Sequence, residues 1–188
     1  KNNLEDLDQL IKEVRLKKTE ALLHDITEAM TTNESFFFRD ATPFEIFEKT
    51  IMPKMLEQRA SKKSLRIWSA ACSTCQEAYS LAMILREMAP KLAGWRIEIV
   101  GTDISKEVLE KSKAGIYSQF EVQRGLPINY LMKYFTQVSE LWQIDAAIRA
   151  MVTYKEFNLL KDLKSLGTFD IIFCRNGLIY FDQPTKTQ

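Results

Sequence analysis

The stretch best suited to bind a ligand runs from an apolar strand, through a turn of small residues, into a helix. Residues 65–71 form an apolar run typical of a buried strand. The turn spans residues 70–75, and from Ala78 to Met88 apolar residues recur at helical spacing. Such a unit brings backbone N–H groups and the positive end of a helix dipole to one place, where a ligand can bind. Because the turn contains no glycine, an ordinary strand–helix unit without a ligand is the alternative.

An acidic residue, Asp103, stands at the carboxyl end of a second predicted strand, residues 96–102. Nucleotide-binding α/β folds hold ribose hydroxyls with an acid in this position. Two strands joined by a helix in this way imply a parallel pair with a right-handed crossover. In the alternative interpretation, Asp103 merely caps the helix that Ser105 begins and Gly115 ends.

Polar residues at 31–35 adjoin three consecutive phenylalanines, then Arg39 and Asp40. By composition alone, this segment is a loop pinned by aromatic anchors, in which Arg39 pairs with Asp40 or caps the loop. A helix is predicted to start directly afterwards, with a capping box formed by Thr42 and Glu45 and a proline at the first helical position.

The cysteines indicate a reducing compartment. The chain has three of them, an odd number that fits the cytoplasm better than a disulfide framework. Cys72 and Cys75 form a C-x-x-C, but His24 is the single histidine and there is no second cysteine pair, so no structural zinc site is expected. We interpret these two cysteines as small turn thiols; redox or metal chemistry is the alternative.

Length and composition narrow the class of protein. The 188 residues are 46% hydrophobic and 27% charged, as in a soluble globular domain with a substantial core. A net charge of +1 provides no field that would recruit nucleic acid or an anionic membrane. No apolar run approaches the roughly 20 residues of a membrane span, and the start does not read as a signal peptide. We therefore expect a cytoplasmic protein without membrane insertion.

The remaining pattern completes an α/β chain. Residues 4–30 are predicted to be helical, as one segment or as two broken near residues 17–19, and Pro53 is expected to kink or restart the helix that follows residue 42. Residues 118–151 interrupt the alternation of strands and helices, and we interpret them as an inserted subdomain. We expect an N-terminal helical segment and linker at 1–40 and a main domain at 41–188. The other predicted elements are a turn at 124–127, a helix at 130–135 and strands at 142–148, 151–157 and 169–174.

Four stretches, in this order and spacing, resemble the CheR family of chemotaxis receptor methyltransferases. They are residues 31–39, 68–77, 101–105 and 173–181, and the resemblance extends to residues 124–127 and 158–160. It implies a Rossmann-like methyltransferase sheet with an inserted small antiparallel β-subdomain. It also implies transfer of methyl from S-adenosyl-L-methionine to glutamate side chains on the cytoplasmic domain of bacterial chemoreceptors, leaving S-adenosyl-L-homocysteine.

The resemblance also assigns site residues. Arg39 and Tyr180 match positions beside the reacting centre, where we expect them to orient groups rather than exchange protons. Asp103 matches the ribose-binding acid, Glu77 a carboxylate near the methionyl end, and no metal is implied. In some members the inserted subdomain docks the receptor tail. Asn158 and Leu159 match adenine contacts. The matched cofactor-binding positions are Asn33, Ser35, Arg39, Glu77, Asp103, Asn158, Leu159, Arg175 and Asn176.

The chain departs from the family pattern in several places. Cys75 stands where the family usually has glycine, so a positive φ there would be strained. Gly177 replaces an apolar residue, and the family's last strands, normally after Phe181, are absent from this chain. Cys75 and the absent strands favour one alternative, a non-catalytic CheR-like domain that binds the cofactor or a partner. A second alternative is a methyltransferase for another substrate class, for which the near-neutral charge argues against nucleic acid.

Overall fold

The computed structural model describes residues 6–17 and 19–186. The chain forms two compact units, residues 1–32 and 33–188. The first unit holds two helices, α1 (Leu7–Lys17) and α2 (Glu20–Met30), so of the two predicted alternatives the one with two helical segments is observed. Residues 4, 5 and 18 of that predicted segment lie outside the described residues. The predicted domain boundary after residue 40 stays a prediction.

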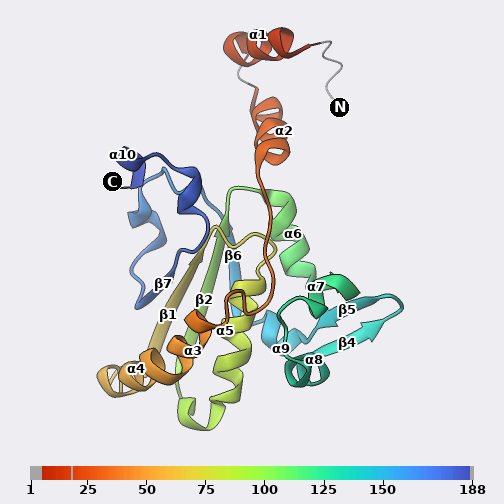
Figure 1. The fold of residues 1–188 in the computed structure, drawn as a ribbon. Coiled ribbons are helices and arrows are strands. Elements are labelled where there is room, and N and C mark those ends of the chain that lie inside the picture. Colours follow the sequence, from red (N-terminus) through yellow and green to blue (C-terminus); the bar gives the residue numbers. More distant parts are fainter. Residues whose placement is uncertain (1–5, 18, 187–188) are drawn as a thin grey trace. The chain divides into compact units, whose positions relative to one another are not determined.

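A four-stranded parallel sheet forms the centre of the second unit, as the α/β prediction requires (Figure 1). Its strands are β1 (Ser64–Ala70), β2 (Arg96–Asp103), β6 (Val152–Glu156) and β7 (Ile171–Phe173), in the order β6-β2-β1-β7. The chain places β2 and β6 on one side of β1 and then β7 on the other. The strand order therefore reverses between β1 and β7, and open α/β sheets bind their ligands at such a point.

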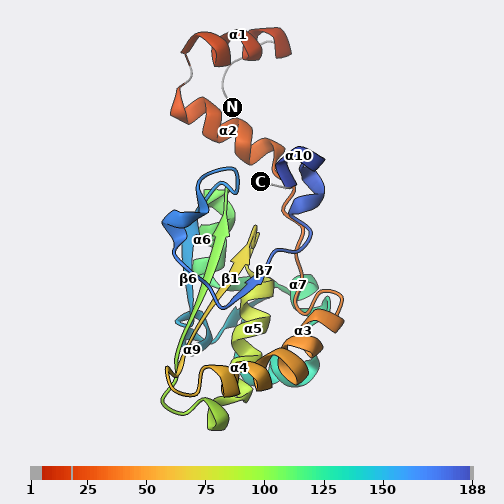
Figure 2. The same ribbon diagram turned by 90° about the vertical axis from the view of Figure 1, so that its left-hand side faces the viewer.

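Helix α5 (Gln76–Glu87) follows β1 and is buried along most of its length. It packs against the sheet, as does α6 (Lys106–Ala114), which follows β2 (Figure 2). Side chains of β1 alternate between two cores, since successive residues of a strand point to opposite faces. Leu65 and Ile67 join the large cluster around α5, whereas Trp68 and Ala70 join a smaller cluster with Phe157.

Both ends of α6 match the prediction. The Ser105 hydroxyl accepts a hydrogen bond from the Val108 N–H at 3.2 Å, and Gly115 ends the helix in the left-handed conformation with φ 63°. A glycine is suited to this position because it lacks a Cβ, so a left-handed φ costs it little.

The helical region before β1 differs from the prediction at its start. Helix α3 (Thr42–Ile46) is capped by Ala41, whose φ is 42°, and no side chain bonds to the cap. The predicted capping box is therefore wrong, because the chain enters the helix one residue earlier, with Thr42 already helical. A π-helical turn, η1 (Phe47–Ile51), follows, and α4 (Met52–Gln58) restarts with Pro53 in its first turn, as predicted.

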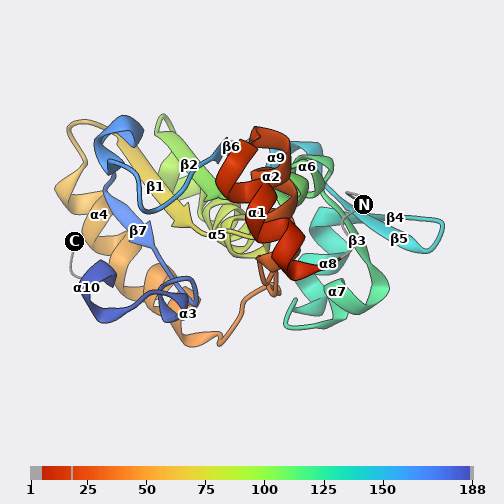
Figure 3. The ribbon, with the colours of Figure 1, turned by 90° about the horizontal axis from the view of Figure 1, so that it is seen from above.

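A small antiparallel sheet with helices beside it occupies the middle of the chain (Figure 3). Its strands β3 (Ile116–Ser118), β5 (Leu141–Ile144) and β4 (Phe135–Val138) lie in that order, so the predicted antiparallel subdomain is present. The predicted strand at 142–148 is wrong in its second half. Asp145 accepts a hydrogen bond from the Ala147 N–H and starts helix α9 (Ala146–Arg149) instead.

The other helices are short. The predicted helix at 130–135 corresponds to α8 (Ile128–Tyr134), and the predicted strand at 169–174 corresponds to the shorter β7. In the part of the chain that the structure describes, no helix has the length and apolar character needed to cross a membrane. The remaining helical elements are α7 (Gln119–Gln123), α8 (Ile128–Tyr134), α9 (Ala146–Arg149), α10 (Gln183–Lys186) and the 3-10 turns η2 (Ala89–Leu92), η3 (Leu163–Leu166) and η4 (Leu178–Tyr180).

Candidate functional site

The turn between β1 and α5 has an unusual backbone for a segment without glycine. Ala71, Ser73 and Cys75 have φ values of 52°, 51° and 61°, in the left-handed region. Each such residue costs about 1–2 kcal/mol relative to an ordinary conformation. Strain of this kind persists where surrounding structure imposes it, and it is concentrated at ligand-binding sites. The Tyr117 hydroxyl donates a hydrogen bond to the Thr74 carbonyl at 2.8 Å and helps to hold the turn.

Asp103 links this turn to the end of β2. Its carboxylate accepts hydrogen bonds from the Ser73 N–H at 2.8 Å and from the Ser105 N–H at 3.0 Å. The residue is only 5% exposed. The helix cap is supplied by Ser105, so the interpretation of Asp103 as a mere helix cap is wrong. The carboxylate is fixed at the carboxyl edge of the sheet, where an acid can accept hydrogen bonds from ribose hydroxyls.

Glu77, in the first turn of α5, faces the loop that follows β7. Its carboxylate accepts a hydrogen bond from the Ser69 hydroxyl at 2.8 Å and pairs with the Arg175 guanidinium at 3.4 Å. Burial raises the pKa of Glu77, while the Ser69 hydrogen bond and the charges of Arg175 and Arg39 oppose that shift. The result is a desolvated carboxylate partly balanced by cations, an arrangement suited to a positively charged ligand group.

The three consecutive phenylalanines anchor the loop before α3, as predicted. Phe37 is fully buried and packs edge-on against Tyr117 and Phe135. The Phe38 N–H donates a hydrogen bond to the Ser80 hydroxyl of α5 at 3.0 Å. The loop is therefore fixed to the same helix that carries Glu77.

Arg39 contacts its own loop rather than its neighbour in sequence. Its guanidinium donates to the Glu34 carbonyl at 3.1 Å and lies 5.3 Å from the centre of the Phe36 ring. The Arg124 guanidinium lies 4.3 Å from the centre of the same ring. Arg124 also pairs with the Glu34 carboxylate at 2.8 Å. The predicted alternative of a pair with Asp40 is wrong, whereas the loop-capping alternative is observed.

Asn158 and Leu159 follow β6, next to β2 at the same edge of the sheet. The Asn158 side-chain carbonyl accepts a hydrogen bond from the Leu160 N–H at 2.9 Å. Leu159 packs against the smaller core cluster that contains Trp68. Both residues are half-buried, so they lie at the boundary between this cluster and solvent. Their assignment as adenine contacts stays a prediction.

Other predicted site residues are less enclosed. Asn33 and Asn176 are exposed, Ser35 is half-buried, and Tyr180 is 63% exposed within η4. Their roles stay predictions. Gly177 has a packing reason, since a Cβ at this position would lie 3.0 Å from the Ala71 Cβ. The missing side chain lets the loop after β7 approach the turn after β1.

Cys72 and Cys75, which belong to the turn, have free thiols that are buried. The Cys75 thiol donates to the Cys72 sulfur at 2.9 Å, and both residues are buried. A Cβ at Gly101 of β2 would come within 3.1 Å and 3.2 Å of the two sulfur atoms, so this glycine makes room for them. Burial raises the pKa of Cys72 well above its ordinary value. Within residues 6–17 and 19–186, no cluster of three or more metal-ligating side chains occurs.

Sequence reasoning missed three residues of this site: Ser69, Asp40 and Arg124. Ser69 follows Ile67 at strand spacing, which places both on the face toward α5, so the alternation of β1 could have identified it. Asp40 pairs with Arg175 at 2.6 Å, and nothing in the sequence indicates a contact over that separation. The same holds for Arg124, which comes from the loop between α7 and α8.

Comparisons with known proteins identify what the chain is similar to. The model of the family "CheR methyltransferase, SAM binding domain" matches residues 33–188. The chain is 37% identical over 187 residues to chemotaxis protein methyltransferase Cher2 of Pseudomonas putida, covering 97% of this chain and 68% of that protein. It is 38% identical to chemotaxis protein methyltransferase 1 of Pseudomonas aeruginosa, with the same coverage.

Two further proteins were matched. Chemotaxis protein methyltransferase 1 of Vibrio cholerae is 36% identical over 191 residues, covering 100% of this chain and 68% of that protein. A solved methyltransferase domain of bacterial CtHen1-CN aligns with 73% of this chain and 54% of its own, at 15% identity and a TM-score of 0.36. The last likeness is too low to support a conclusion.

The described residues fit S-adenosyl-L-methionine. The Ser73 hydroxyl oxygen is buried without a hydrogen-bond partner, so the turn holds an unused polar atom next to Asp103. Asp103 and Glu77 supply the acceptors that ribose hydroxyls and a cationic ligand require. A buried polar atom without a partner is costly, and a bound ligand would relieve that cost.

Proposed function

Because this chain belongs to the CheR methyltransferase family, with S-adenosyl-L-methionine as its cofactor, we propose that it methylates glutamate side chains of bacterial chemoreceptors. The coarser function, cofactor-dependent methylation in chemotaxis, follows from the family. The finer assignment of a protein glutamate as acceptor is supported most by one observation. The cluster of Arg39, Glu77 and Arg175 offers charge and hydrogen bonds at the point where the strand order reverses.

The chemistry needs little from the protein beyond alignment. When bound, the cofactor supplies an electrophilic methyl group on a sulfonium centre, and transfer leaves a neutral thioether. A glutamate side chain has a pKa of about 4.3, so at neutral pH the acceptor is already ionised and requires no general base. Rate therefore depends on aligning the acceptor oxygen with the methyl carbon and on excluding water.

Arg39 is suited to hold the acceptor. A guanidinium offers a planar fork that binds a carboxylate through two hydrogen bonds. Its loop is anchored through Phe37 and Phe38, which limits the freedom of the guanidinium. We expect Tyr180 to orient a group beside the methyl-transfer site. In the free protein this side chain is exposed within a 3-10 turn, where an acceptor could reach it.

We assign cofactor binding to the carboxyl edge of the parallel sheet. Asp103 would hold the ribose, Glu77 the methionyl end, and Asn158 with Leu159 the adenine. The other predicted contacts are Asn33, Ser35, Arg39, Arg175 and Asn176. The partner would be the cytoplasmic domain of a chemoreceptor, and the small antiparallel sheet is the surface that we expect to dock its tail.

A methyl-transfer assay tests the proposal. Receptor-containing membranes are incubated with the protein and cofactor labelled in its methyl group, and the label on the receptor is measured. We expect labelled receptor that releases methanol in alkali, because a carboxyl methyl ester is base-labile whereas methylated nitrogen is not. A receptor with alanine at its acceptor glutamates is the control.

Other outcomes of this assay favour the alternatives. Cofactor binding by calorimetry without any transfer would support a non-catalytic CheR-like domain. Base-stable label on another component would support a methyltransferase for a different substrate class. Absence of cofactor binding would contradict the assigned site itself.

A further inference from the structure

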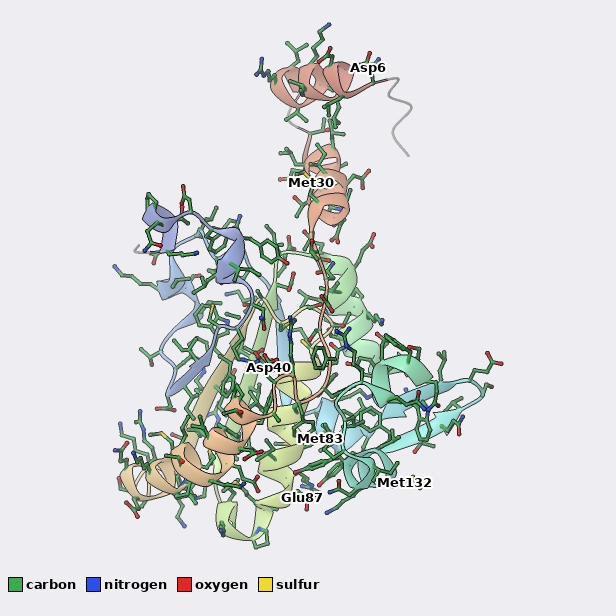
Figure 4. All side chains as sticks on the ribbon, in the orientation of Figure 1. Asp6, Met30, Asp40, Met83, Glu87 and Met132 are labelled. Carbon is green, nitrogen blue, oxygen red and sulfur yellow. The ribbon has the colours of Figure 1, made fainter. Side chains whose placement is uncertain are left out.

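Asp40 connects two parts of the candidate site that are distant in sequence. Its carboxylate pairs with the Arg175 guanidinium at 2.6 Å, and the other amino group of Arg175 faces Glu77 at 3.4 Å (Asp40 is labelled in Figure 4). The Asp40 side chain is 63% exposed, whereas those of Arg175 and Glu77 are only 18% and 12% exposed. A pair with one exposed member adds little to stability, so stability alone is a weak reason for it.

The backbone at Asp40 is strained. Its φ is 65°, and those of Phe38 and Ala41 are 50° and 42°, all in the left-handed region. Aspartate tolerates this conformation better than most residues, but Phe38 and Ala41 do not share that advantage. The strained residues belong to the segment that positions the Asp40 carboxylate beside Arg175. Backbone strain of this kind is concentrated in functional segments.

Five charged side chains belong to the candidate site. Arg39 and Arg175 carry two positive charges, and Asp40, Glu77 and Asp103 carry three negative ones when ionised. S-adenosyl-L-methionine has a net charge of +1, from its sulfonium, ammonium and carboxylate groups. S-adenosyl-L-homocysteine is neutral overall, because its sulfur is a thioether. Each negative charge that faces the ligand therefore attracts the cofactor more than the product.

We propose that Asp40 acts through Arg175 as a positioning residue that makes the site favour the positively charged cofactor over its neutral product. This inference rests on the proposed function of the site. With its carboxylate in place, Arg175 is neutralised and held beside Glu77. Without it, the guanidinium is balanced by Glu77 alone, and the site carries one negative charge fewer. The cofactor then loses an attraction that the product never had.

Calorimetry with both ligands tests the proposal on the parent protein, Asp40→Asn and Asp40→Glu. We expect Asp40→Asn to raise the Kd of the cofactor about fivefold while that of the product changes less than about twofold. Asp40→Glu keeps the charge and should restore most of the preference. In 1 M salt, where the Debye length is about 3 Å, the difference between parent and Asp40→Asn should shrink. In the transfer assay, KM for the cofactor should rise while kcat stays nearly constant.

Glu45→Gln is the matched control. Glu45 is an exposed carboxylate on α3 that pairs with Lys49 at 3.3 Å, so its loss removes the same charge outside the site. Neither Kd should change in this variant. Asp40→Ser provides a second neutral variant should Asp40→Asn fold poorly, which thermal unfolding would reveal.

Equal weakening of both ligands in Asp40→Asn and Asp40→Ser would show a purely structural role and overturn the inference. Unchanged affinity for both ligands would do the same. These results leave the proposed function intact, since the parent protein would still bind its cofactor. If the parent protein binds neither ligand, the proposed function fails and this inference fails with it.

Discussion

The Glu77 carboxylate and the Arg175 guanidinium lie 3.4 Å apart across the point where the order of the parallel strands reverses. Glu77 comes from the helix after β1, and Arg175 from the loop after β7. The loops after β1 and after β7 follow neighbouring strands, and α5 begins at the end of the loop after β1. Because the strand order reverses here, a side chain from one loop can contact a side chain from the other.

Glu77→Gln should make stability less dependent on pH. Burial raises the pKa of Glu77 above its ordinary value of 4.5, so the folded protein holds this proton more tightly than the unfolded chain. That contribution to stability is present below about pH 4.5 and is lost as the pH rises through the raised pKa. The free energy of unfolding of Glu77→Gln, relative to the parent, should therefore increase from about pH 4.5 toward neutrality. Chemical denaturation at several pH values measures this difference.

Glu87→Gln on the same helix is the control with the opposite sign. Hydrogen bonds from Lys133 and Tyr134 lower the pKa of Glu87. Its contribution to stability is present above its ordinary pKa and is lost as the pH falls, so this variant should be slightly less stable than the parent at neutral pH. Equal pH dependence in the two variants would contradict the assignment. Glu77→Gln should also weaken cofactor binding, and Glu87→Gln should not.

Asp103→Ala should weaken cofactor binding by about 1–3 kcal/mol, the value of a hydrogen bond to a charged acceptor. Asp145→Ala is the matched control. Both carboxylates accept hydrogen bonds from backbone N–H groups, but Asp145 caps α9, whereas Asp103 holds the turn after β1. The control should lose about 0.5–2 kcal/mol of stability with unchanged cofactor affinity. Affinity of Asp103→Ala equal to the parent would remove this residue from the site.

Cys75→Gly tests whether the strained turn limits the cofactor site. Cysteine at φ 61° is less stable by about 1 kcal/mol than glycine in the same backbone conformation. The variant also loses a buried thiol that packs against Cys72 and Gly101, so its free energy of unfolding should change by less than about 1 kcal/mol. We expect calorimetry to show tighter cofactor binding. Equal or weaker binding would mean that the turn accommodates cysteine, and the non-catalytic alternative would lose support.

Arg39→Ala should reduce methyl transfer sharply while leaving the thermal midpoint nearly unchanged. The guanidinium makes one hydrogen bond to a backbone carbonyl and contacts the Phe36 ring, so the fold depends little on it. Arg39→Lys should recover little activity, because an ammonium does not reproduce the planar fork. Arg86→Ala, which removes an exposed arginine of α5, is the control. Transfer by Arg39→Ala at the parent rate would refute the acceptor-binding role.

Gly125→Ala should destabilise the second unit strongly. A Cβ at this position would lie 2.2 Å from the Phe37 carbonyl oxygen, and its φ of 84° is left-handed. Gly94→Ala has a similar φ of 77°, but its nearest neighbour would be 4.0 Å away. We expect about 1 kcal/mol of lost stability for Gly94→Ala, from strain alone, and a larger loss for Gly125→Ala. Similar losses, measured by chemical denaturation, would show that the clash is relieved by small movements.

The sequence alone was sufficient for features that depend on neighbouring residues. The buried strand at β1, the Ser105 cap and the Gly115 terminus are local, because each depends on residues within a few positions. Four motifs in a fixed order were enough to indicate the family. Asp103 was predicted as a ribose-binding acid from its position after a strand. Where local signals competed, prediction failed: the Asp145 cap ended β5 early, and the strained loop at Ala41 replaced a capping box.

Only the tertiary structure decided which charges meet. The contacts of Asp40 with Arg175, and of Glu77 with Arg175, join residues 135 and 98 positions apart. The periodicity of a sequence does not predict such a pair, because the contact depends on the order of the strands in the sheet. The same applies to Arg124 on Phe36, and to the left-handed turn that is held without glycine by Tyr117 and Asp103. Chain order sets the residue types at each loop, whereas sheet topology sets which loops become neighbours.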